Sequence, residues 1–372
     1  MNDKAYYPYF DYLRLILASI VMFSHDGLIA WEYSGQLAVD VFFALSGWLI
    51  GGLLLKFNNT KELPRFYFNR AIRIWIPYYI ALVFIIIASL MKDPIDLKWA
   101  EFIAYKITWV YNIYGTPQLY ECIACMPLDG TANHFWSVNA EEQFYLLAPL
   151  VLVVFKSIGR SVATWVLIVL VLWLTDSYVS ISFGVLAALL NYRFVGFNER
   201  PTSKFLIVFL ILATATGLYV DDKYYLYAPI FAISTVLLLT IRGEKRAFSS
   251  FLGGISYPLY LNHWIGIFFF NLALEPYGLR DSNTRYFLSA VMNYAIAGVL
   301  YWYVEKRVLA LRAKLFTTSR AIALCHFAYL SILSGLTLGL LLSTRIDAAV
   351  LLLIFLSAYV TAYILVIKKQ KK

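Results

Sequence analysis

The sequence carries an arginine and a histidine near opposite ends of one apolar segment, RLILASIVMFSH, at Arg14 and His25. On an α-helix, eleven positions return to within about 20° of the starting direction and advance about 16 Å, so the two side chains share one face. Asp11 stands three residues before Arg14, a spacing that suits an ion pair. We therefore predict a polar stripe along this helix. The structural alternative is a stripe that only joins helices by hydrogen bonds.

A second group of reactive side chains lies in HFWSVNAEEQFYLLAP, residues 134–149. Ser137 and Glu141 are four residues apart and share a helix face, which Tyr145 continues, whereas Glu142 points elsewhere. Glu141 is expected at a membrane depth near that of His25. An imidazole and a carboxylate from two helices can act together as a general base. The pairing of these two residues is a hypothesis, because other carboxylates in the chain could take the same part.

The segment RFYFNRAIRIWIPYY contains the pair Arg70 and Arg73. The two residues are three positions apart and lie on one helix face, next to Pro77. Two guanidinium groups on one face suit the binding of phosphate. The alternative is a solvated basic flank at the cytoplasmic end of a membrane helix.

Composition defines the kind of protein that must position these groups. The chain has 372 residues, of which 61% are hydrophobic and 14% charged, and its mean hydropathy is +0.70. Soluble domains are about half apolar and about a quarter charged, so this chain is a polytopic, all-α membrane protein. Twelve spans are expected, at 10–29, 36–55, 73–91, 139–155, 161–175, 178–194, 204–220, 224–241, 255–274, 284–305, 321–343 and 347–367.

The basic residues predict the orientation of these spans. With the N-terminus inside, 23 of the 31 Lys and Arg residues lie on the inner side, 7 lie on the other side, and Arg14 lies within the first span. Such an asymmetry indicates that both termini are cytoplasmic. We expect a multi-pass protein integral to the plasma (inner) membrane. It also accounts for the net charge of +9 without a nucleic-acid partner.

The three cysteines suggest one short disulfide. Cys122 and Cys125 lie in the long outer loop 92–138, where an oxidising compartment would allow them to pair, whereas Cys325 lies inside a span. Zinc would need two more ligands, and only His134 is nearby, so we expect no metal site. His134 itself is expected at the surface, in an interfacial aromatic segment.

Taken together and in order, the segments resemble the integral-membrane acyltransferase 3 family, whose members transfer acyl groups, usually acetyl, to sugars of cell-envelope polysaccharides and related acceptors. The resemblance runs from residue 10 to residue 307 and also includes GQLAVDVFFALSGWLIGG, GGISYPLYLNHWIG and YWYVEKR. It implies a ten-helix acyltransferase core in residues 1–310. Residues 311–372 then form two additional transmembrane helices with a basic cytoplasmic tail.

The resemblance also assigns parts to individual residues. His25 would activate the acceptor hydroxyl as a base or carry the acyl group transiently, and Glu141 would orient its imidazole. Arg14, Arg70 and Arg73 would bind the donor. The remaining positions implied as supporting residues are Asp11, Trp136, Ser137, Glu142, Tyr145 and His263. Asp26, directly after the histidine, departs from the apolar residues expected there.

The implied activity is O-acetyl transfer from cytoplasmic acetyl-CoA, or another acyl-CoA, to a sugar hydroxyl of an envelope or exported glycan or of a lipid-linked saccharide. Membrane lipid is the only other partner expected, and no cofactor is expected to stay bound. A lipid, peptidoglycan or a small exported metabolite stays open as acceptor. A twelve-span transporter is the alternative from another class, but such proteins are expected to show two related halves, and the sequence shows no such repeat.

Overall fold

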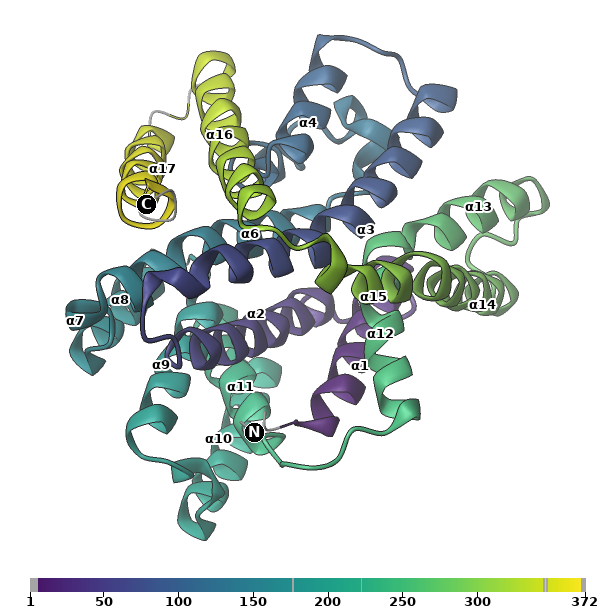
Figure 1. Cartoon of the computed structure of the whole chain (residues 1–372). Coiled ribbons are helices and arrows are strands. Elements are labelled where there is room, and N and C mark those ends of the chain that lie inside the picture. The colour runs from purple at the N-terminus through teal and green to yellow at the C-terminus, as the bar shows by residue number, and fades with distance from the viewer. Residues whose placement is uncertain (1–5, 176, 222, 344, 346, 369–372) are drawn as a thin grey trace. The chain divides into compact units, whose positions relative to one another are not determined.

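The computed structural model describes residues 6–175, 177–221, 223–343, 345 and 347–368 (Figure 1). These residues form helices and turns with no strand, so the predicted all-α class is confirmed. The basic residues Lys4, Lys369, Lys371 and Lys372, which contribute to the predicted charge asymmetry, lie outside the described residues.

The chain divides into two compact units. Unit 1 comprises Met1–Lys56 and Ser157–Tyr303, and unit 2 comprises Phe57–Lys156 and Val304–Lys372. The division into a core of residues 1–310 and an addition of residues 311–372 stays a prediction.

Unit 1 contains the helix with the arginine and histidine. Its helices are α1 (Pro8–His25), α2 (Ser34–Leu54), α8 (Val162–Leu174), α9 (Val179–Arg193), α10 (Pro201–Val220), α11 (Tyr224–Leu238), α12 (Ala247–Asn262), α13 (Trp264–Leu274) and α14 (Asn283–Leu300). Proline in the first turn starts α1 and α10, where its missing N–H would have no helical partner. The short helices of this unit are η6 (Phe197–Glu199) and η7 (Glu275–Tyr277).

Close approach between backbones holds α2 against α9. A Cβ atom added to Gly47 would collide with the carbonyl oxygen of Ile181, and one added to Gly184 would collide with that of Ala44. Small residues at such crossings are typical of membrane helices, which pack by van der Waals contact rather than by the hydrophobic effect. A small residue also lies where α1 contacts α12, because Gly253 packs directly against the side chain of Asp11.

Unit 2 is built around the longest helix, α3. Its helices are α3 (Leu63–Lys92), α4 (Leu97–Ile107), α5 (Tyr111–Tyr114), α6 (Phe135–Pro149), α15 (Lys306–Leu315), α16 (Thr318–Leu342) and α17 (Ala348–Ala362). Its short helices are η1 (Thr60–Glu62), η2 (Thr116–Gln118), η3 (Ile123–Cys125), η4 (Pro127–Gly130), η5 (Leu150–Val154) and η9 (Tyr363–Ile367). Two elements, α7 (Lys156–Gly159) and η8 (Tyr301–Glu305), lie where the chain passes between the units.

The C-terminal helices are integral parts of unit 2. Helix α16 packs against α3 and lies beside α17 (Figure 1). The hydroxyl of Tyr329 in α16 donates to the Leu146 carbonyl in α6 at 2.9 Å, and Tyr329 is completely buried. Burial of this aromatic ring with its hydroxyl bonded makes α16 a structural support of α3 and α6.

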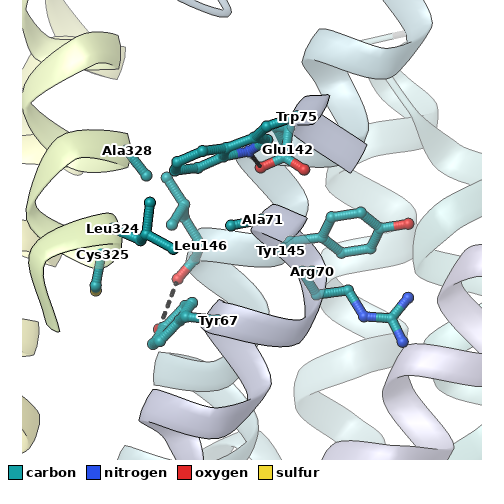
Figure 2. Close-up of a pocket in the computed structure, with 10 residues that line it drawn as sticks. All are labelled: Tyr67, Arg70, Ala71, Trp75, Glu142, Tyr145, Leu146, Leu324, Cys325 and Ala328. Carbon is teal, nitrogen blue, oxygen red and sulfur yellow. Dashed lines mark hydrogen bonds between the residues drawn. The ribbon is translucent and has the colours of Figure 1, made fainter. Parts of the chain in front are cut away.

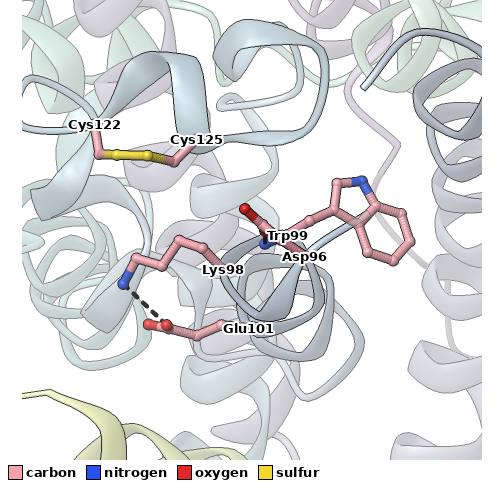
Figure 3. Close-up of a disulfide and its surroundings, with 6 residues drawn as sticks. All are labelled: Asp96, Lys98, Trp99, Glu101, Cys122 and Cys125. Carbon is pink, nitrogen blue, oxygen red and sulfur yellow. Dashed lines mark hydrogen bonds and ion pairs between the residues drawn. A yellow bond between two sulfur atoms is a disulfide. The ribbon is translucent and has the colours of Figure 1, made fainter. Parts of the chain in front are cut away.

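The segment between α3 and α6 folds into short helices. Within it, a disulfide joins Cys122 to Cys125, three residues later (Figure 3). The disulfide suggested by the sequence is therefore present. Helix α4 starts at an Asp96 cap, whose carboxylate accepts from the Trp99 N–H at 2.7 Å. Lys98 pairs with Glu101 on the first turn of this helix at 2.9 Å (Figure 3).

Six helices of the described residues are long and apolar enough to cross a membrane: Ser34–Leu54, Thr60–Lys92, Pro201–Val220, Asn283–Leu315, Thr318–Leu342 and Ala348–Ile367. Three shorter apolar helices, α8, α9 and α11, match further predicted spans. The other predicted spans fall on α1, on α6 with η5, and on α12 with α13. The polytopic class is thus confirmed, and the number twelve stays a prediction.

The predicted span at 255–274 is divided at His263. The side chain of Asn262 donates to the Pro258 carbonyl at 3.0 Å, and the ring of His263 binds the Tyr260 carbonyl at 2.8 Å. Side chains that take carbonyls from the helical ladder break or bend a helix. Sequence hydropathy contains no signal for this break, because both halves are apolar.

Candidate active site

The polar stripe predicted on the first helix is present. Helix α1 is continuous from Pro8 to His25, and Arg14 Nη1 lies 3.2 Å from Asp11 Oδ1. Asp11 also accepts from the hydroxyl of Tyr6. The predicted ion pair therefore exists, and Tyr6 holds its carboxylate from a second side.

The imidazole of His25 contacts a second imidazole, that of His263. His25 Nδ1 lies 2.8 Å from His263 Nε2, and the ring centroids are 5.1 Å apart. His263 Nδ1 lies 2.8 Å from the backbone oxygen of Tyr260. His263 is 1% exposed, whereas His25 is exposed. The geometry thus gives His25 a buried hydrogen-bond partner and leaves its own ring accessible.

Asp26, the residue after His25, forms a buried ion pair that the sequence analysis missed. Its carboxylate binds the guanidinium of Arg285 in α14, and these side chains are 1% and 4% exposed. Arg285 Nη2 also donates to the backbone oxygen of Asp26 at 3.1 Å, and Arg285 lies over the ring of Tyr286. The signal available in the sequence was the unexpected Asp26 itself, because a buried carboxylate needs a partner.

In unit 2, the predicted arginine pair belongs to a larger cluster of guanidinium groups. The guanidinium group of Arg70 is repelled by those of Arg73 and Arg312. That of Arg312 is also repelled by those of Arg65 and Arg73. Arg312 is in α15, which packs against α3. The cluster of Arg65, Arg70, Arg73 and Arg312 concentrates positive charge at the N-terminal half of α3, an arrangement suited to a multiply charged anion. Neither Arg65 nor Arg312 is among the site residues predicted from the sequence.

Two carboxylates partly offset the positive charge of the arginine cluster. The carboxylate of Glu141 attracts the guanidinium group of Arg70, and the carboxylate of Glu305 attracts that of Arg73. The guanidinium of Arg70 lies 5.8 Å from the ring centroid of Tyr145 and 5.9 Å from that of Phe66. Within unit 2 the structure therefore brings together Arg70, Glu141 and Tyr145, which the sequence analysis treated as two separate groups.

Helix α6 carries the remaining predicted residues. Trp136 lies in its first turn, and the hydroxyl of the neighbouring Ser137 donates to the His134 carbonyl at 3.1 Å. Glu142 points towards α3, where its Oε2 accepts from Trp75 Nε1 at 3.0 Å (Figure 2). The prediction that Glu142 diverges from Glu141 agrees with this contact.

A small pocket with a volume of about 10 Å³ opens beside Arg70 (Figure 2). Its walls come from α3, α6 and α16, including Trp75, Glu142 and Cys325. Among the described residues, Glu142 Oε1 and Arg70 Nε are buried atoms without a hydrogen-bond partner. Helix α16 therefore takes part in forming a small, largely apolar pocket next to a predicted donor-binding arginine.

The expectation that His134 lies at the surface is wrong. His134 is 2% exposed and packs against Phe135, with ring centroids 5.0 Å apart. The segment before α6 is therefore not a simple interfacial loop, because its histidine is buried in the fold. His25 lies in unit 1 and Glu141 in unit 2, and the pairing of these two residues stays a prediction.

Comparison with known proteins identifies the family. The model of the acyltransferase domain (Acyl_transf_3) matches residues 7–302. The chain belongs to the acyltransferase 3 family. The matched range includes α1, α3, α6, α12 and α13, and therefore every residue predicted for the site, whereas α15, α16 and α17 lie beyond it.

Relatives within the acyltransferase 3 family are named as O-acetyltransferases. The peptidoglycan O-acetyltransferase OatA of Listeria monocytogenes is 32% identical over 162 residues, which are 41% of this chain and 25% of the relative. A protein of Staphylococcus aureus (strain COL), whose name describes an O-acetyltransferase, is 28% identical over 315 residues, 71% of this chain and 51% of the relative. The chain thus spans a quarter to about half of the length of these relatives. No solved structure matches the chain.

Proposed function

We propose that this chain is a membrane O-acetyltransferase that transfers acetyl from cytoplasmic acetyl-CoA to a sugar hydroxyl of a cell-envelope or exported glycan. The observation that carries the proposal is the accessible imidazole of His25, held by a buried partner, His263, on a helix that also carries Arg14. Family membership and the names of the relatives support the acyl-transfer chemistry.

The donor would enter from the cytoplasmic side of the inner membrane, the side on which both termini are proposed to lie. Acetyl-CoA carries several phosphate groups, and the cluster of Arg65, Arg70, Arg73 and Arg312 supplies guanidinium groups that match them. Arg14, in unit 1, would face the acyl end of the donor.

In the transfer step, His25 removes the proton of the acceptor hydroxyl as its oxygen bonds to the acetyl carbon. The bond from that carbon to sulfur breaks, and the thiolate of CoA takes the proton from the imidazolium. Alternatively, the imidazole of His25 bonds to the acetyl carbon as the carbon–sulfur bond breaks and the CoA thiolate leaves. In a second step the acceptor oxygen bonds to that carbon as the carbon–nitrogen bond breaks, and the freed imidazole takes the hydroxyl proton and passes it to the thiolate. Because His263 already contacts Nδ1 of His25, Glu141 is proposed to favour the positive charge that the imidazole gains in either route.

The acceptor is proposed to be a glycan or a lipid-linked saccharide. One relative is named for peptidoglycan, which makes peptidoglycan an acceptor to test directly. A lipid or a small exported metabolite would use the same chemistry, because each offers a hydroxyl to the same base.

The test uses membranes that contain the full chain, acetyl-CoA labelled in the acetyl group, and envelope glycan as acceptor. We expect release of free CoA and labelled glycan, with the loss of both in His25→Ala. The matched control is His326→Ala, because His326 is a second helix-borne histidine, which contacts Tyr359 in α17. Full transfer by His25→Ala would refute the mechanism, and uptake of an unmodified solute without CoA release would favour the transporter.

A further inference from the structure

Three groups form a hydrogen-bonded chain that ends on the accessible histidine. The backbone oxygen of Tyr260 lies 2.8 Å from His263 Nδ1, and His263 Nε2 lies 2.8 Å from His25 Nδ1. All three residues belong to unit 1. The two imidazole planes differ by 23°, so the rings are nearly parallel.

The carbonyl at the start of the chain determines the direction of both bonds. A carbonyl oxygen can only accept, so His263 Nδ1 must carry a hydrogen. His263 is 1% exposed, and a cation is costly at such a buried position. In the neutral ring only one nitrogen carries a hydrogen, so His263 Nε2 presents its lone pair. It therefore accepts from His25 Nδ1–H, which places the lone pair of neutral His25 on Nε2.

The surrounding backbone fixes His263 in this position. Its own N–H donates to the Leu259 carbonyl at 2.9 Å, as the last helical bond of α12. On its other side, the N–H of Gly266 donates to Asn293 Oδ1 at 2.8 Å, which ties the start of α13 to α14. A Cβ at Gly266 would collide with Asn293, so the contact requires glycine. Short contacts on both sides thus prevent the ring of His263 from following that of His25.

We propose that His263 is a positioning residue that selects one tautomer of His25, with hydrogen on Nδ1 and the reactive lone pair on Nε2. This inference rests on the proposed function, since a lone pair matters only if His25 reacts. In the base route, Nε2 takes the hydroxyl proton and returns it to the CoA thiolate. In the carrier route, Nε2 bonds to the acetyl carbon as the carbon–sulfur bond breaks. In both routes Nδ1–H remains donated to His263.

The first experiment reads the tautomer in the wild-type chain. The protein is labelled with nitrogen-15 in histidine, and the nitrogen spectra are recorded in lipid; the chain has only 4 histidines, so the His25 signals are assigned from His25→Ala. We expect a protonated Nδ1 and an unprotonated Nε2 for His25. A hydrogen on Nε2 of neutral His25 would overturn the proposal, whatever the activity of the enzyme.

The second experiment compares His263→Gln with His263→Leu. A glutamine amide can accept from His25 through its oxygen and donate to the Tyr260 carbonyl through its nitrogen, whereas leucine can do neither. We expect His263→Leu to lower kcat about 100-fold, in the range of general-base effects, with little change in KM for acetyl-CoA. His263→Gln should recover most of that loss. An unchanged kcat in His263→Leu would overturn the proposal, as would equal losses in two variants that both fold.

The two experiments separate this proposal from the proposed function. If His25 shows the expected tautomer but His25→Ala still transfers acetyl, the proposed function fails while the assignment of the tautomer stands. If His25→Ala is inactive but the hydrogen lies on Nε2, only the part given to His263 fails.

Discussion

Arg285 binds both the carboxylate and the backbone oxygen of Asp26, the residue that directly follows His25. One side chain of α14 therefore holds the end of α1 at the position of the accessible imidazole. Both partners are almost fully buried. The pair explains why a charged residue stands after the histidine of an otherwise apolar helix.

Breaking this pair should be costly. Arg285→Met leaves a buried carboxylate without its cation, and we expect about 3–5 kcal/mol of lost stability, measured by thermal unfolding in detergent. The double variant Asp26→Leu with Arg285→Met should recover part of the loss. The control is Arg280→Met, which breaks an ion pair to Glu275 whose side chains are 58% and 59% exposed, and should cost less than about 1 kcal/mol. Equal losses of stability for Arg285→Met and Arg280→Met would contradict the conclusion that the pair of Asp26 and Arg285 is buried.

Two glycines of α2 provide a matched test of the helix crossing. Gly47→Ala places a methyl group against the Ile181 carbonyl, and we expect about 1–3 kcal/mol of destabilisation from overpacking. Gly52→Ala meets no atom within 4 Å, and alanine is the better helix former, so its stability should be unchanged or slightly higher. Melting temperatures of the two variants check the difference, and similar values would argue against the close approach of α2 and α9.

The enlarged arginine cluster predicts a contribution from outside the range matched by the family model. Arg312→Gln should raise KM for acetyl-CoA about tenfold, because a lost bond to a charged group costs about 1.5 kcal/mol, with little change in kcat. Arg320→Gln is the control, since Arg320 is exposed and binds the Leu315 carbonyl. Steady-state kinetics at low ionic strength would show the effect best. An unchanged KM in Arg312→Gln would exclude this residue from donor binding.

Lys106 in α4 predicts a pH dependence of stability. It is 2% exposed, donates to the Ala132 carbonyl at 3.2 Å and lies over the ring of Tyr111. Burial lowers the pKa of Lys106 well below its usual value. The unfolded chain then binds the proton more tightly, so stability rises with pH from the folded pKa up to about 10.4, by at most about 1.4 kcal/mol per pH unit.

Lys106→Met should remove this dependence. The melting temperature of Lys106→Met minus that of wild type should be largest near neutral pH. This difference should fall as pH approaches 10, because wild type becomes more stable while the variant does not. Lys98→Met is the control, because Lys98 is 36% exposed and pairs with Glu101. A difference between wild type and Lys106→Met that stays constant with pH would contradict the prediction.

Features that depend on residues near one another in the chain could be predicted from the amino-acid sequence. The helix through Arg14 and His25, the pairing of Asp11 with Arg14 and the divergence of Glu141 and Glu142 all follow from the 3.6-residue period of a helix. The disulfide between Cys122 and Cys125 is also local, but the sequence alone left open whether the two residues pair. The order of motifs also indicated the family before any contact was known.

Contacts between groups that are far apart in the chain are visible only in the folded protein. His263 lies 238 positions after His25, and Arg285 lies 259 positions after Asp26. Apolar membrane helices have no hydrophobic preference for one neighbour over another, and their partners are chosen by shape and by interhelical hydrogen bonds. Periodicity and hydropathy do not encode those choices. The imidazole pair, the buried ion pair behind it and the addition of Arg312 to the arginine cluster therefore became visible only once the helices were packed.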